Sequence, residues 1–237
     1  MSPSALGLGL GMPFSAAPAG GGSLQSASLL WYETNDVVLN GTPAVTAIND
    51  QGPSGLTLGF AVPNPWVAAG GPNGAPYMQH QQHGIIAGAS LLVCPATSIQ
   101  TVYVVGRLLP LHGATKNLLF CDDSLSGIQI SIFGQANQIA VESGGKQAFA
   151  NVPGQPWYAA RFRWNLSGSA VKVTGVVEGT DPTQPLFGAP RFWNFLYTQT
   201  GANYDTCLVA VFDEDTISTG RDVEMQAHIL SAYNLAL

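Results

Sequence analysis

Short segments in which apolar and polar side chains alternate, separated by turn residues, dominate the sequence from residue 28 onward. Within 128–132, three isoleucines alternate with Gln129 and Ser131, which is the period of a strand with one buried face. Glycine (28 residues) and proline (16 residues) are spread along the chain and supply turns. The sequence therefore predicts an all-β antiparallel sandwich, with strands over 28–32, 37–39, 56–60, 99–105, 118–121, 128–132, 138–142, 157–164, 170–177 and 207–212.

In two of these segments the sequence indicates which faces of the strand are buried. In 157–164 the positions 158, 160, 162 and 164 are apolar, whereas Arg161 and Arg163 point to the other side of the strand. The segment 207–212 is apolar on both faces, which indicates a central strand covered on both sides.

The segment 61–84 is rich in proline, glycine and asparagine, and we expect a long loop with little regular structure. It contains Trp66 and Tyr77, two aromatic side chains for which three roles stay open. Both rings suit a protein interface, packing in the interior, or stacking on a sugar ring of a glycan.

The last segment changes from strand to helix periodicity. Val223, Leu230 and Tyr233 recur at helical spacing, and Thr219 with Asp222 three residues later matches a capping box. We therefore expect one short C-terminal helix over 220–233 that ends near Asn234.

The segment 1–27 reads as an extended N-terminal arm. Glycine alternates with leucine and is followed by two prolines and a glycine triplet, so this segment cannot form a core of its own. It has no Lys or Arg in its first 22 residues, unlike a secretory signal. We expect it to anchor the domain 28–237 on a neighbouring subunit, or else to fold back on its own domain, through Leu6, Leu8, Leu10, Met12 and Phe14.

The chain is poor in charge. Charged residues make up 9%, and the net charge is −6 with only eight Lys and Arg. Because binding to nucleic acid needs clustered cations, nucleic acid is disfavoured as a partner. No apolar run is long enough for a transmembrane span. The shortage of charge is explained best if other subunits cover part of the surface.

Two separated stretches carry a family resemblance. Leu30 to Val37 (LWYETNDV) with 45–55 (VTAINDQGPSG) resembles the entry strand and turn of concanavalin A-like/laminin-G-like jelly-roll domains of tailed-bacteriophage structural proteins, although Ile48 stands where that family usually has Trp. The stretch 208–237 resembles their closing strand, acidic turn and short helix. The resemblance covers about residues 28–237.

The resemblance implies a non-enzymatic virion structural protein that decorates the head or belongs to the tail or fibres. Its partners would be other virion proteins, and it would be a homo-oligomer, with a trimer as one option, made in the host cytoplasm. The alternative is a carbohydrate-binding adhesin module on the virion that contacts host surface glycans. Fold alone does not choose between them.

Few residues suggest chemistry. Asp213-Glu214-Asp215 follows a strand and reads as a solvated turn, with a Ca²⁺ site and catalysis as weaker readings because glycoside hydrolysis needs a suitably spaced carboxylate pair. Asp122-Asp123 reads as a turn with Ca²⁺ as the alternative, and His80 with His83 as a polar loop rather than a zinc site. The three cysteines, Cys94, Cys121 and Cys207, are expected to be buried free thiols. We assign no catalytic residue, metal or cofactor.

Overall fold

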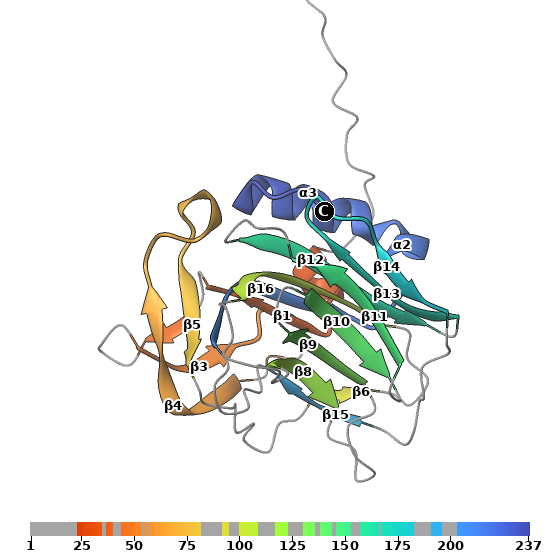
Figure 1. Cartoon of the computed structure of the whole chain (residues 1–237). Helices are drawn as coiled ribbons and strands as arrows, with labels where there is room; N and C mark the ends of the chain where they lie inside the picture. Colours follow the sequence, from red (N-terminus) through yellow and green to blue (C-terminus); the bar gives the residue numbers. More distant parts are fainter. Residues whose placement is uncertain are drawn as a thin grey trace, which may run out of the picture.

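Two antiparallel sheets face each other, and a helix covers the outer face of the larger one (Figure 1). The predicted β-sandwich fold is therefore confirmed. The computed structural model describes residues 23–34, 37–39, 44–53, 55, 57–81, 92–94, 100–108, 117–122, 130–135, 138–143, 146–152, 157–165, 167–182, 191–195 and 203–237.

The larger sheet has ten strands within the described part of the chain, nine in a continuous order and β1 (Leu30–Glu33) beside β16. In spatial order the nine are β14 (Gly179–Asp181), β13 (Gly168–Val173), β12 (Tyr158–Asn165), β7 (Gln100–Leu108), β16 (Asn203–Phe212), β5 (Tyr77–Gln81), β4 (Thr57–Val67), β3 (Ala44–Asn49) and β2 (Val37–Leu39).

The smaller sheet has six strands among the described residues. Its spatial order is β11 (Lys146–Asn151), β10 (Gln138–Ser143), β9 (Ile130–Gln135), β8 (Asn117–Asp122), β15 (Arg191–Phe195) and β6 (Leu92–Cys94).

Strand β16 lies at the centre of the larger sheet, as predicted from the segment 207–212, which is apolar on both faces. Val209 and Val211 belong to the core between the two sheets, whereas Leu208, Ala210 and Phe212 pack under the C-terminal helix. Because alternate side chains leave opposite faces of a strand, β16 contributes to both hydrophobic layers.

The core between the sheets is built mainly from aromatic and branched side chains. The larger sheet contributes the face of β12 that the sequence predicts to be apolar, and the smaller sheet contributes strands β10 and β11. The members on these three strands are Tyr158, Ala160, Phe162, Trp164, Ile139, Val141, Ala148 and Ala150.

The second layer lies between the larger sheet and helix α3 (Arg221–Tyr233), which is preceded by the short helix α2 (Thr216–Thr219) (Figure 1). Met225, Ile229 and Tyr233 of α3 are buried on the sheet. The helix ends at Asn234, which adopts a left-handed conformation with φ 54°, so the predicted end is correct.

The predicted start at residue 220 is correct to within one residue, but the predicted capping box is wrong. The residue at the N-cap of α3 is Gly220, with φ 80° and no side-chain cap, and it also closes α2. The capping side chain belongs to Asp215, which accepts a hydrogen bond from the backbone N–H of Ile217 at the start of α2. Thr219 and Asp222 therefore form no capping box, because Asp222 is turned toward the sheet.

The loop predicted over 61–84 is also wrong. Strand β4 runs to Val67, residues Pro72–Gly74 form one 3₁₀ turn, and β5 begins at Tyr77. Cross-strand pairing of Trp66 with Met78 and of Val67 with Tyr77 outweighs the turn composition of the segment.

The first 22 residues, with the arm residues Leu6, Leu8, Leu10, Met12 and Phe14, lie outside the described residues. Residues 24–27, which the prediction included in the arm, form the short helix α1 (Leu24–Ala27). Ser23 caps α1, and Leu24 packs against the layer between the larger sheet and α3.

A charged network ties α3 to the sheet. Asp222 accepts hydrogen bonds from Arg161 Nη1 on β12 at 2.7 Å and from the Tyr103 hydroxyl on β7 at 2.5 Å. Arg161, 6% exposed, also pairs with Glu178 at 2.7 Å. Burial alone would raise the pKa of Asp222, but the bonds from Arg161 and Tyr103 outweigh burial and hold that pKa below its ordinary value.

The first prediction concerns this network. Asp222→Asn should lower the free energy of unfolding by about 3 kcal/mol at pH 7, since it leaves Arg161 buried without one carboxylate partner. The loss should shrink below about pH 4, because a carboxylate with a depressed pKa stabilises the fold only while it is ionised. Urea unfolding at several pH values measures both effects. Glu224→Gln, the same chemical change at an exposed residue, should cost at most about 0.5 kcal/mol.

Candidate functional site

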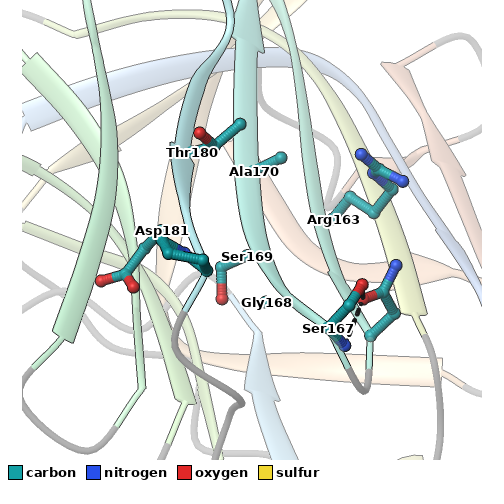
Figure 2. A pocket seen from close by; sticks show the side chains of 9 residues that line it. Arg163, Ser167, Gly168, Ser169, Ala170, Thr180 and Asp181 are labelled. Carbon is teal, nitrogen blue, oxygen red and sulfur yellow. Dashed lines mark hydrogen bonds between the residues drawn. The ribbon is translucent and has the colours of Figure 1, made fainter.

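A small open pocket lies where strands β12, β13 and β14 meet (Figure 2). Its volume is about 210 Å³, below the range of roughly 300–1,000 Å³ that is usual for drug-sized ligands. It is lined by Arg163, Asn165, Ser167, Gly168, Ser169, Ala170, Thr180, Asp181 and Pro182.

The turn between β12 and β13 shapes one side of the pocket. The Asn165 side-chain oxygen accepts hydrogen bonds from the backbone N–H of Ser167 at 2.8 Å and from its hydroxyl at 2.6 Å. Such an Asx turn fixes the chain direction without help from the core. The pair Asn165 and Gly168 closes the hairpin, and the pairs Ser169–Asp181 and Ala170–Thr180 bring β14 alongside.

Gly168 makes the close approach of β13 and β14 possible. Its φ is +141°, and a Cβ at this position would overlap the carbonyl oxygen of Asp181. Only glycine combines this backbone conformation with this lack of space. Gly168 therefore sets how the pocket is built, although it offers no side chain to a ligand.

An ion pair at the end of β16 borders the pocket. Arg163 Nη1 lies 3.1 Å from Asp215 Oδ2, and the Asn165 side-chain amide donates to the same oxygen at 3.4 Å. Burial would raise the pKa of Asp215, but the charge of Arg163 and its hydrogen bond hold that pKa below the ordinary value. The charge of Arg163 is therefore largely neutralised.

The lining offers hydrogen-bonding groups of several kinds. Ser167, Ser169 and Thr180 supply hydroxyls, Asn165 supplies an amide, and Asp181 supplies a carboxylate. In Figure 2 these side chains come from both sides of the β12–β13 turn and from β14, and the Asp181 carboxylate points away from Arg163. Such a set can both donate to and accept from a ligand that carries several hydroxyls.

The pocket does not present the arrangement needed for glycoside hydrolysis. Retaining enzymes use two carboxyl groups about 5 Å apart. Asp181 is the only acidic residue among the nine that line the pocket. The lining thus contains no carboxylate pair.

The structure places the aromatic candidates away from this pocket. Tyr77 is 8% exposed and packs edge-on against Trp157, with 5.1 Å between the ring centroids, while Arg107 stacks on both rings. Trp66 is half-buried against the core between the sheets. Both rings thus contribute to packing in this structure, and their roles at an interface or in contact with a glycan stay predictions.

The acidic cluster lies at the predicted turn between β16 and α2. Two of its members are less solvated than expected, because Glu214 pairs with Arg221 and Asp215 pairs with Arg163. Asp122 ends β8, and Asp123 and His83 lie outside the described residues. His80 lies on β5.

Cys207 is a buried free thiol, as predicted, and burial raises its pKa. It is the extra residue of a β-bulge, because Thr206 pairs with Gly106 and Leu208 pairs with Val105. Cys94 and Cys121 lie on β6 and β8. Among the described residues, no group of three His, Cys, Asp or Glu side chains is arranged to hold a metal ion.

A second polar cluster joins the C-terminal helix to β1. Glu33 accepts hydrogen bonds from the Tyr233 hydroxyl at 2.7 Å and from the Trp31 indole at 3.3 Å, and His228 Nε2 lies 3.2 Å from it. Burial opposes ionisation of Glu33, but these partners lower its pKa below the ordinary value. The His228 ring packs edge-on against Trp31.

The pocket has no distinctive signature in the sequence. Its residues are common polar types, and the stretch from Asn165 to Ser169 reads simply as a turn. A hairpin signal could have been found there, since Asn, Ser and Gly follow a strand that ends at 165. The contribution of Thr180 and Asp181 depends on pairing between β13 and β14, which the sequence does not show.

No described helix is long and apolar enough to cross a membrane. No protein-family model matches the chain, and no curated protein matches it.

Several solved structures match in fold. An arabinofuranosidase complexed with arabinofuranosyl-α-1,2-xylobiose aligns with a TM-score of 0.54 and 10% identity, over 75% of this chain and 49% of that one. A structure described as HCR/D-Sa-GBL1/C aligns with a TM-score of 0.51 and 8% identity, over 86% and 52%. The binding domain of botulinum neurotoxin serotype G aligns with a TM-score of 0.48 and 9% identity, over 84% of this chain and 51% of that one. The chain thus spans about half the length of these structures, and the first two support the β-sandwich fold.

The second prediction tests the role of Gly168. Gly168→Ala should destabilise the domain by more than Gly175→Ala, by about 1–3 kcal/mol. Both glycines have positive φ values, +141° and +68°, but a Cβ at Gly175 meets nothing within 4 Å. The difference between the two thermal unfolding midpoints measures the clash with Asp181 together with the greater backbone strain of alanine at φ +141°. Equal losses of stability would show that the close approach of β13 and β14 is not required.

Proposed function

We propose that this domain is a non-enzymatic carbohydrate-binding module that takes one sugar ring of a glycan in the pocket between β12, β13 and β14. The observation that carries the proposal is the pocket itself. It is the size of a small ligand, it is open at the surface, and its lining is mostly hydroxyl, amide and carboxylate groups. Polar groups of this kind fix the orientation of a hydroxyl-rich ligand.

The fold supports the same proposal in a weaker way. The sandwich is shared with an arabinofuranosidase that was crystallised with an oligosaccharide. At 10% identity this likeness concerns the fold and not the binding residues, so the sugar is inferred from the pocket alone.

The charges around the pocket select the class of sugar. Arg163 is the only cationic residue among the nine that line the pocket, and it is paired with Asp215, so the lining offers no unpaired cation to attract an anion. A carboxylate-bearing sugar would therefore find no free cation in the lining with which to form an ion pair. A neutral sugar can instead donate a hydroxyl to Asp181 and accept from Ser169, which is paired directly with Asp181 and lies on the same face of the sheet.

The third prediction tests the pocket in the full-length protein. Binding of neutral glycans on an array, confirmed by calorimetry, should weaken roughly ten- to a hundredfold in Asp181→Asn, since hydrogen bonds to a charged group contribute about 1.5–3 kcal/mol. Glu224→Gln removes one negative charge from a residue that does not line the pocket, and it should leave affinity unchanged.

The proposal fails if no neutral or acidic glycan binds, or if binding is equal in the wild type and in Asp181→Asn. Binding of acidic glycans in preference to neutral ones would keep the pocket but contradict the assignment of the sugar class.

A second candidate function is the virion structural role that the sequence resemblance implies. The low content of charge, 9%, together with exposed apolar side chains on the helical face, Val223 and Leu230, favours a protein that is partly covered by others. Under this proposal the module is attached to a bacteriophage particle and presents its pocket outward. Self-association of the purified protein at micromolar concentration, measured by sedimentation velocity, is the expected sign; a monomer at every concentration would count against a homo-oligomer.

A further inference from the structure

An exposed aromatic ring lies on the outer face of the smaller sheet. Phe149 belongs to β11, where its neighbours Ala148 and Ala150 point into the core between the sheets, so the Phe149 side chain leaves the opposite face. It is 51% exposed and is the only exposed aromatic residue among those whose side chains the structure describes. A flat ring in this position offers its face to a ligand that can stack on it.

Two hydrogen-bonded polar pairs flank Phe149 on the same face of the β10–β11 hairpin. Gln138 is paired with Asn151 on one side of the ring and donates a hydrogen bond to it at 3.2 Å. Glu142 is paired with Gln147 on the other side and accepts a hydrogen bond from it at 3.4 Å. Because every second residue of a strand shares a face, each pair lies about 7 Å from Phe149 along the hairpin.

The neighbouring strands hold Phe149 in place without covering its ring. The residue directly opposite on β10 is Ala140, whose buried methyl group is too small to cover the ring. Strand β14 lies against the backbone of Phe149 at Gly179, where a Cβ would overlap the Phe149 carbonyl oxygen. The ring is therefore carried by a rigid part of the sandwich, as a preformed binding surface requires.

We propose that this hairpin binds one pyranose ring of a neutral glycan, stacked on Phe149. A pyranose with equatorial hydroxyls has C–H bonds on its faces and hydroxyls around its rim. Phe149 matches the face of such a ring, and the amide and carboxylate groups of the two polar pairs can donate to and accept from its rim. We call Phe149 and these two pairs the stacking site. It is a second site on the domain and does not require that the pocket between β12, β13 and β14 binds a sugar.

The composition of this surface favours a sugar over a protein partner. None of the other large apolar side chains that are exposed in the described part of the chain lies on β10 or β11. Protein interfaces bury a continuous apolar core inside a polar rim, whereas the stacking site has one ring between polar pairs, which suits one small ring. Glu142 is its only charged residue, so an acidic sugar would gain no ion pair there.

Titration of the full-length protein with cellopentaose, a neutral glucose oligosaccharide with equatorial hydroxyls, tests the proposal when followed by backbone amide NMR. The amide signals of 138–143 and 146–151 should shift as sugar is added. Phe149→Leu keeps an apolar side chain but removes the aromatic face, and it should weaken the affinity measured from these signals roughly tenfold. Phe149→Tyr should keep the affinity, and so should the control Val177→Ala, at an apolar residue that is 86% exposed and lies outside the stacking site.

The variant Asp181→Asn separates the stacking site from the pocket, because Asp181 lines only the pocket. The shifts in 138–151 should persist in this variant. Shifts confined to the residues that line the pocket would overturn this inference and leave the proposed function standing, and shifts confined to the hairpin would do the reverse. Equal affinity in Phe149→Leu and the wild type, or no shift in the hairpin at all, overturns the inference. Hairpin shifts that arise on concentrating the protein without sugar, and that Phe149→Leu abolishes, also overturn it, because the ring would then contact a second copy.

Discussion

The second half of strand β16, from Cys207 to Phe212, has no polar face, and this single property requires the three layers of the structure. Its odd- and even-numbered side chains must both leave water, so a second sheet covers one side and a helix covers the other. The neighbouring strands β7 and β12 follow the same scheme, with Val102 and Phe162 on the sandwich side and Tyr103 and Ala159 on the helix side. The C-terminal helix is thus part of the core and not an appendage.

The layer under the helix contains a buried cation, Arg161, whose charge must be neutralised. Arg161 lies on the face covered by α3, where a lone cation would be costly. Asp222 from the helix and Glu178 from the β13–β14 turn neutralise it. The apolar contacts hold the helix against the sheet, and this charged network fixes its position along the sheet, since a shift by one turn would separate Asp222 from both of its partners.

Much of this architecture could be predicted from the sequence. Period-2 alternation located strands such as 157–164 and assigned Arg161 to the face away from the sandwich core. The helix was found by its spacing and its end at Asn234. The errors arise where local composition competes with pairing at long range. Pro, Gly and Asn in 61–84 indicated a loop, but cross-strand contacts extend β4 and begin β5 within it, and Asp222 was assigned to a cap because its true partner lies 61 residues earlier in the chain. The pocket could not be predicted at all, because its residues meet only when β14 pairs with β13.

The position of the pocket also limits how its specificity can change. Strand β14 is the last strand at its end of the larger sheet among the described residues, has only three residues, and is followed by Pro182. A short edge that ends in proline offers few free backbone groups to another chain. Lengthening β14 to enlarge the pocket would create a longer free edge on which other chains could add as strands. Diversification of the ligand is therefore expected through substitutions in the β12–β13 turn, which leave the edge of the sheet protected against aggregation.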